Sequence, residues 1–154
     1  MLFRAVPTPC VGICSTTYGD TVCRGCRRYL HEVIDWNRFR DDEKRLVWQR
    51  LDGQLAQVLP RYFAIHDAEL LRARLTALRI PFREEASPWT WLFALLKAAA
   101  RQSPDLASFG VQRLDTGDVD LASLREQLQA ELHTLASAYH ERDLIRAVRH
   151  PDAN

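Results

Sequence analysis

Four cysteines within seventeen residues are the side chains of this sequence best suited to chemistry. Cys10, Cys14, Cys23 and Cys26 form the pattern Cys-x3-Cys-x8-Cys-x2-Cys, and the chain has no other cysteine. Two short chelating pairs joined by a turn can place four thiolates around one zinc ion or one iron–sulfur cluster. The spacing therefore predicts a single metal site with these four residues as ligands.

A disulfide framework is the main alternative interpretation of the cysteines. Disulfides persist in oxidising compartments, whereas residues 1–9 lack the apolar run of a secretory signal. Four unrelated thiols are a second alternative, but chance would scatter them along all 154 residues. We therefore favour metal binding and expect a cytoplasmic protein.

Glycine stands inside both cysteine pairs, as Gly12 in the first and Gly25 in the second. A residue without a Cβ atom lets backbone N–H groups turn toward a neighbouring sulfur, as in a zinc knuckle. Between the pairs, Gly19 and Asp20 are typical of a turn, so we expect a small hairpin over residues 15–22.

Three arginines, Arg24, Arg27 and Arg28, flank the second cysteine pair. Four thiolates around a zinc ion leave a net negative charge, and cations beside them favour thiolate over thiol. These arginines are therefore candidate second-shell partners of the metal, and the alternative is that they face water. His31 follows closely, but we expect it to be exposed and not to act as a ligand because four cysteines complete a tetrahedron.

Four stretches of the N-terminal third resemble a known family: Pro9-Cys10-Val-Gly-Ile-Cys14, Cys23-Arg-Gly-Cys26-Arg, Glu32-Val-Ile-Asp-Trp36 and Asp42-Glu43-Lys44-Arg45. They are similar to the bacterial domain of unknown function 1289, over about residues 7–60. Members are small proteins often labelled predicted iron–sulfur proteins. The resemblance implies a four-cysteine metal module followed by helices, and no activity. Arg27-Arg28 departs from it, standing where a glycine usually follows the last cysteine.

Helical periodicity dominates the rest of the chain. Asp67 is a candidate helix cap, and Ser87 followed by a proline is typical of a helix start. Asp105 precedes another short helix, and residues 111–120 indicate a turn with a little strand. The expected longer helices cover residues 42–60, 68–79, 88–101 and 121–149.

These elements predict a mainly α fold. A small N-terminal four-cysteine knuckle, possibly with a short hairpin, packs on a four- to five-helix body. We assign residues 7–60 to the metal-binding module with its following helices, and residues 61–154 to a helical region of the same compact unit. The apolar segment 89–100 is too short to cross a bilayer, so it is expected to be the central core helix. The alternative is a partner-docking helix with Trp89 and Trp91 as anchors.

No catalytic constellation is present in the sequence, since it lacks a phosphate-binding glycine loop, a serine elbow and a paired histidine metal motif. The preferred hypothesis is a structural zinc module that serves interaction with a protein partner. The alternative is an iron–sulfur protein in electron transfer or redox sensing, because zinc and iron compete for the same thiolates.

A third hypothesis is a nucleic-acid-binding adaptor, although the formal net charge of +1 does not indicate one. Its stacking side chains would be Tyr29, Trp36 or Phe39. In the competing interpretation these aromatics are packed inside and the arginines pair with acidic neighbours. The basic patch would consist of Arg24, Arg27, Arg28, Arg38, Arg40, Lys44, Arg45 and Arg50.

Overall fold

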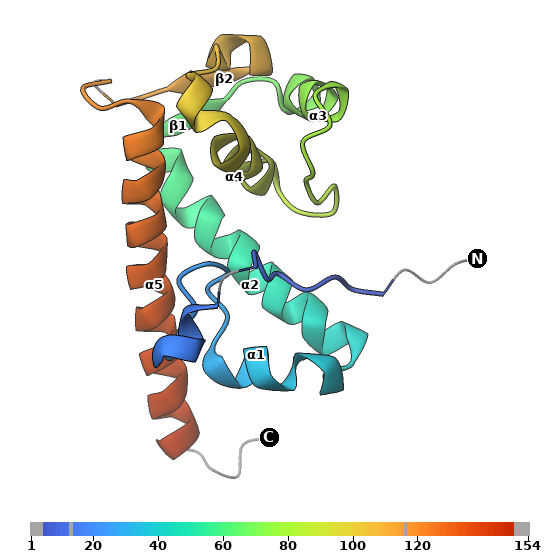
Figure 1. Cartoon of the computed structure of the whole chain (residues 1–154), viewed down its shortest axis with the longest axis vertical. Helices are drawn as coiled ribbons and strands as arrows, with labels where there is room; N and C mark the ends of the chain where they lie inside the picture. Colours follow the sequence, from blue (N-terminus) through green and yellow to red (C-terminus); the bar gives the residue numbers. More distant parts are fainter. Residues whose placement is uncertain (1–4, 13, 116, 150–154) are drawn as a thin grey trace. The chain divides into compact units, whose positions relative to one another are not determined.

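The computed structural model describes residues 5–12, 14–115 and 117–149. Helices dominate this part of the chain (Figure 1), so the prediction of a mainly α fold is confirmed. In chain order the elements are α1 (Leu30–Asp35), α2 (Asp41–Val58), β1 (Phe63–Ile65), α3 (Ala68–Ala77), α4 (Pro88–Ala99), β2 (Val111–Arg113) and α5 (Leu121–Arg149), with short 3₁₀ helices between several of them.

The helix boundaries follow local capping chemistry. The carboxylate of Asp67 accepts a hydrogen bond from the backbone N–H of Leu70 at 3.0 Å, so the predicted cap of α3 is confirmed. At the start of α4, however, the Ser87 side chain makes no cap bond of its own. Instead, the Asp52 carboxylate accepts from the Ser87 N–H at 3.2 Å and from its hydroxyl at 2.8 Å.

The chain divides into two compact units. The first combines the chain up to Leu51 with the chain from Glu131 onward, and the second runs from Asp52 to Ala130. These units cut across the segments 7–60 and 61–154 that we distinguished by the sequence resemblance, because the contacts divide the chain within α2 and within α5. The last part of α5 therefore belongs to the same unit as the cysteines.

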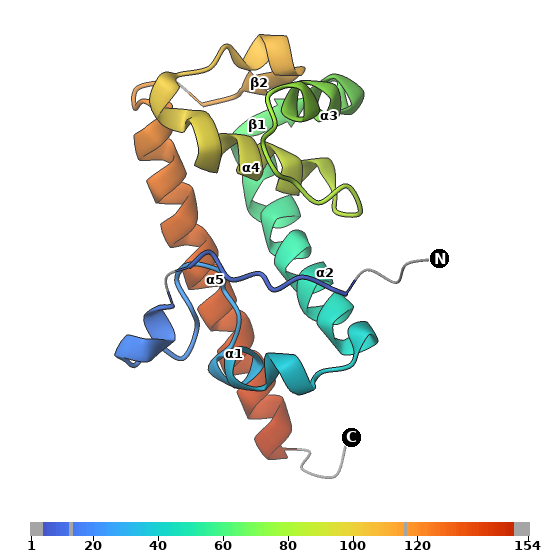
Figure 2. The same cartoon turned by 45° about the vertical axis from the view of Figure 1, so that its right-hand side comes forward.

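The second unit holds the sheet, α3 and α4. β1 pairs with β2 in antiparallel register, with Phe63 opposite Arg113 (Figure 2). Gly110 precedes β2 with a φ of 72°, and a Cβ atom there would lie 2.5 Å from the carbonyl oxygen of Asp67, so only glycine fits. The strand expected within residues 111–120 is confirmed as β2, while Thr116 in the predicted turn lies outside the described residues.

Helix α4 is a core helix. It packs against α3 and buries the side chains of Trp91, Leu92, Phe93, Leu95 and Leu96. Trp91 is also held by a hydrogen bond from its ring N–H to the carbonyl oxygen of Arg83 at 2.6 Å. Throughout the described ranges, every helix is either too short or too polar to cross a membrane.

The first unit contains two small apolar clusters. One is formed by Val22, Tyr29 and Ala136, with Tyr139 packed against it. The other is formed by Trp36, Val47 and Leu51, with Phe39 and Trp48 packed against it. The first cluster joins the cysteine-bearing segment to α5, and both views show the two lying side by side (Figures 1 and 2).

Candidate metal centre

The second cysteine pair lies in a tight backbone turn. An isolated antiparallel bridge between Val22 and Tyr29 closes the turn. Within it, the N–H of Cys23 donates to the carbonyl oxygen of Arg28 at 2.9 Å, and the N–H of Arg27 donates to the carbonyl oxygen of Cys23 at 2.8 Å. Both Cys23 and Cys26 are buried in this turn.

The hairpin expected over residues 15–22 is wrong. A 3₁₀ helix, Ser15–Tyr18, occupies the first half of this linker, and Gly19 ends it with a φ of 102°. The N–H of Gly19 donates to the carbonyl oxygen of Thr16 at 3.1 Å. The glycine was thus correctly identified as a turn residue, but it closes a helical turn because the residues before it bond locally and not across to a partner strand.

Backbone N–H groups are directed at the first sulfur of each pair. The N–H of Gly12 donates to Sγ of Cys10 at 3.3 Å. Burial raises the pKa of Cys23, but the backbone N–H groups of Cys26, Ser15 and Gly25, together with the Cys26 side chain, lower this pKa to about 7. Gly12, with a φ of 97°, has the backbone conformation that glycine favours, while the role predicted for Gly25 stays a prediction.

Arg28 contacts the second sulfur of the buried pair. Its Nε donates to Sγ of Cys26 at 3.2 Å, and its guanidinium lies 5.1 Å from the ring centre of Trp36. Burial raises the pKa of Cys26, and the Arg28 hydrogen bond and charge oppose that rise. Since Arg28 is only 4% exposed, its charge needs a nearby anion, and the Cys26 sulfur is in place to be that anion as a thiolate.

The two other arginines are placed differently. The Arg24 side chain is exposed and pairs with Asp20 at 3.2 Å. Arg27 is buried and donates from Nη2 to the carbonyl oxygen of Leu51 at 3.2 Å. Burial lowers the pKa of Arg27 to about 10, against the opposing effect of Cys26. Its φ of 65° lies in the left-handed region that glycine adopts most easily, which explains the glycine expected near this position.

The first cysteine pair lies apart from the second. Cys10 is exposed, and Cys14 is half-buried with its Sγ 2.7 Å from Oγ1 of Thr16. The hydroxyl of Ser15, next to Cys14, accepts from the N–H of Arg24 at 2.8 Å and so ties the two pairs together. Within the described part of the chain, no three Cys, His, Asp or Glu side chains are grouped closely enough to hold a metal ion.

A buried ion pair stabilises the turn from the α1 side. The carboxylate of the buried Glu32 accepts hydrogen bonds from both terminal nitrogens of Arg50, with N–O distances of 2.7 and 2.5 Å. Glu32 also accepts from the N–H of Tyr29 at 2.8 Å, and the Arg50 guanidinium lies 4.0 Å from the Tyr29 ring centre. Sequence reasoning did not find this pair. The available signal was the position of Glu32, three residues after the helix cap.

The burial of two aromatic residues removes two of the three stacking side chains of the nucleic-acid hypothesis. Tyr29 is 4% exposed and Trp36 is 6% exposed, so neither can stack on a base. Phe39 packs against the cluster that contains Trp36. Arg40 pairs with Asp42 at 3.2 Å, as the competing interpretation expected. His31 is exposed, as predicted.

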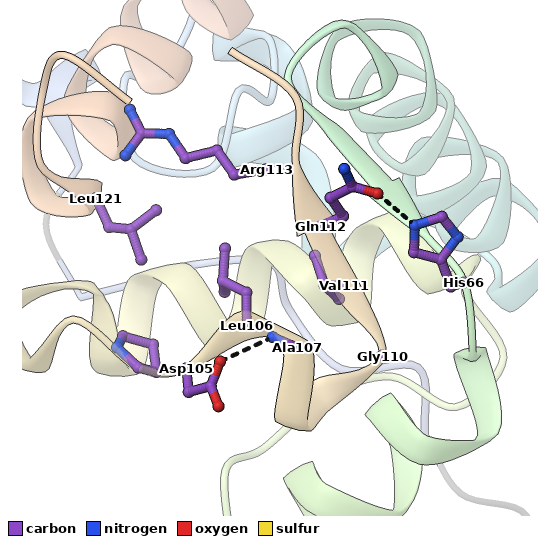
Figure 3. Close-up of a pocket in the computed structure, with 10 residues that line it drawn as sticks. His66, Asp105, Leu106, Ala107, Gly110, Val111, Gln112, Arg113 and Leu121 are labelled. Carbon is purple, nitrogen blue, oxygen red and sulfur yellow. Dashed lines mark hydrogen bonds between the residues drawn. The ribbon is translucent and has the colours of Figure 1, made fainter. Parts of the chain in front are cut away.

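The second unit has a separate open pocket of about 620 Å³ between β2, the segment before it and the start of α5 (Figure 3). Its polar side chains are engaged with one another or with backbone. His66 Nε2 lies 2.7 Å from Oε1 of Gln112, Arg113 pairs with Asp115, and Asp105 accepts from the N–H of Ala107. The lining also has apolar surface from Leu106, Val111 and Leu121. Among these lining residues we find no pair arranged for catalysis.

Comparison with known sequences identifies the class of protein. The chain belongs to the family described as protein of unknown function (DUF1289), whose profile matches residues 8–55 and so includes all four cysteines. Uncharacterized protein YdhL of Escherichia coli (strain K12) is 42% identical over 57 residues, which cover 34% of this chain and 71% of that protein. The same values hold for YdhL of Shigella flexneri. No solved structure matches the chain significantly.

Proposed function

We propose that this protein binds one zinc ion through Cys10, Cys14, Cys23 and Cys26, and that the site is a structural module serving interaction with a protein partner. The observation that carries the proposal is the surroundings of the buried pair, where three backbone N–H groups point at the Cys23 sulfur and a buried guanidinium meets Cys26. The contacts at Cys23 favour its thiolate, and the Arg28 contact opposes the rise that burial imposes on the pKa of Cys26. Thiolates are the form that binds metal.

The balance of buried charge supports this proposal. Arg27 and Arg28 are both buried, Arg27 with a hydrogen bond to the carbonyl oxygen of Leu51 and Arg28 with one to the Cys26 sulfur. Taking two guanidinium groups out of water is costly unless anions accompany them. Metal-bound thiolates supply that negative charge, whereas four neutral thiols would not.

The first cysteine pair can reach the second by a local movement of the N-terminal segment. Cys14 directly precedes Ser15, whose N–H already points at the Cys23 sulfur and whose hydroxyl is bonded to Arg24. Cys10 is exposed and four residues earlier. Cys10 and Cys14 together with the buried pair would complete four thiolates, a closed tetrahedral set typical of structural zinc. Bound zinc would supply folding free energy to this unit.

The test is metal analysis of protein purified anaerobically. Zinc, iron and acid-labile sulfide are measured per chain for the wild type, for Cys23→Ser and for a matched control, Ser123→Ala, which lies on the exposed side of α5. We expect about one zinc per chain in the wild type and control, and a large loss in Cys23→Ser. Iron with equimolar sulfide would refute zinc in favour of a cluster, and metal-free protein after zinc loading would refute the site.

A further inference from the structure

Tyr29 joins the cysteine turn to helix α5. Its backbone forms the bridge with Val22 that closes the turn around Cys23 and Cys26. Its hydroxyl donates to Oδ2 of Asp143 in α5 at 2.9 Å, a contact between residues 114 positions apart. Tyr29 therefore contacts the cysteine turn through its backbone and helix α5 through its side chain.

One face of α5 meets this turn. Nε2 of His133 lies 3.2 Å from the carbonyl oxygen of Val22, and Ala136 is packed in the cluster with Val22 and Tyr29. The ring of His140 lies 4.8 Å from the ring of Tyr29. These α5 residues and Asp143 follow one another at spacings of three or four, which places them on a single side of the helix.

Apolar burial in this part of α5 is concentrated before the Tyr29–Asp143 contact, at Leu132 and Ala136, each 0% exposed. Leu144 and Ile145, just beyond Asp143, are 50% and 52% exposed, so they add little burial. A helical segment of this length is only marginally stable in water without a packed face. Its order should therefore depend on whether the turn that carries Val22 and Tyr29 is itself ordered.

We infer that metal binding at the four cysteines controls the order of α5 from residue 131 to 147, and that Tyr29 transmits the effect. The inference rests on the proposed function. Metal-binding free energy is folding free energy in small units with little apolar core, and the apolar clusters that the described residues of the first unit form around Val22 and Trp36 are small. Without metal, the turn opens, the Val22–Tyr29 bridge is lost and this face of α5 loses its contacts.

The experiment is hydrogen exchange with mass spectrometry on the full chain, zinc-loaded and then stripped by a chelator under reducing conditions. We expect stripping to accelerate amide exchange of residues 131–147 by about a hundredfold or more. Amides of α3 and α4 in the second unit are the internal reference, and we expect their exchange to stay unchanged.

Tyr29→Phe tests the transmitting residue. It removes the hydroxyl that bonds Asp143 and keeps the ring that stacks on Arg50. In the zinc-loaded state we expect exchange of residues 137–147 to rise about fivefold, the effect of losing one hydrogen bond, with zinc content unchanged. Tyr18→Phe is the matched control, because this tyrosine lies in the linker between the cysteine pairs and is 86% exposed.

A second variant, Asp143→Ala, removes the acceptor from the α5 side and leaves every residue of the turn in place. The same rise in exchange is expected. If zinc binds but stripping leaves exchange of residues 131–147 unchanged, the inference is wrong and the proposed function stands. If zinc-loading conditions yield metal-free protein, both are wrong. Equal exchange in Tyr29→Phe, Asp143→Ala and Tyr18→Phe would exclude Tyr29 as the transmitting residue.

Discussion

The two compact units of this chain bury different kinds of side chain. Among the described residues, the buried charged side chains Arg27, Arg28 and Glu32 all belong to the first unit. The second unit buries an apolar set that includes Leu71, Leu75, Leu92, Leu95 and Leu96, each 0% exposed. The second unit therefore has a conventional hydrophobic core, while the first depends on charges that must be compensated.

This difference explains why the cysteines lie in the first unit. Apolar burial stabilises a domain without any ligand. Buried guanidinium groups stabilise a fold only when anions meet them, and the Cys26 sulfur bonds Arg28 and acts electrostatically on Arg27. We therefore expect the first unit to respond to metal and charge changes, and the second to respond to changes in side-chain volume.

Metal removal should have the largest effect and should separate the two units. We expect chelation, or the Cys23→Ser substitution, to make the bonds after Arg24 and Arg38 rapidly accessible to trypsin, because structural zinc contributes on the order of 10 kcal/mol to small zinc modules. Peptide bonds within α3 and α4 should stay protected. Simultaneous cleavage in both units would contradict the expectation that only the first unit depends on metal.

Leu95→Ala should produce the converse result. Leu95 is fully buried in α4, so its truncation should cost about 3 kcal/mol of unfolding free energy through lost burial and a residual cavity. Chemical denaturation followed by fluorescence measures the loss. Zinc content per chain should not change. The control is Leu78→Ala, at a half-exposed position just after α3, which should cost much less.

Glu32→Gln tests the buried charge of the first unit. The substitution keeps the shape of the side chain but leaves Arg50 without its carboxylate partner. We expect a loss of about 2 kcal/mol, below the value for fully buried pairs because Arg50 still reaches water. The measurement is urea denaturation of the zinc-loaded protein. Glu69→Gln, which breaks the exposed pair with Arg72, is the control and should have almost no effect.

Arg28→Ala should weaken metal retention, and Arg24→Ala should not. Arg28 donates to the Cys26 sulfur, while the Arg24 side chain is turned to Asp20. Loss of a group that bonds a metal ligand typically lowers affinity about tenfold or more. Competition with a colorimetric chelator measures retention. Equal metal retention by the two variants would show that the contact between Arg28 and the Cys26 sulfur does not strengthen metal binding.

The smallest expected effect is a pH-dependent change in thermal stability that arises at the start of α5. Hydrogen bonds from Ser123 hold the pKa of Asp120 below its ordinary value. A carboxyl group whose pKa is lower in the folded state stabilises the fold above the ordinary carboxyl range, and this contribution is lost as pH falls through the lowered pKa. Asp120→Ala should therefore lower the Tm slightly at pH 7 and make no difference at pH 2. Thermal unfolding at the two pH values is the measurement.

Local sequence signals predicted several parts of this structure correctly. The cap of α3 at Asp67, the long helix from Leu121 and the amide of Gly12 beside Cys10 all depend on residues within a few positions of one another. Strand β1 was missed because three residues are too few to show a period. The hairpin expected over residues 15–22 failed because a turn glycine does not indicate whether strands or a helical turn precede it.

The sequence by itself determined the cysteine spacing, the helical segments and the family, since each is written in neighbouring residues or in a contiguous match. Only the tertiary structure decided that Arg28 and not Arg24 meets sulfur, that Glu32 pairs with Arg50, and that Tyr29 bonds Asp143. For the Glu32 and Tyr29 contacts the physical reason is distance along the chain. The Glu32 and Tyr29 contacts join residues 18 and 114 positions apart, and which partners meet depends on how whole elements pack.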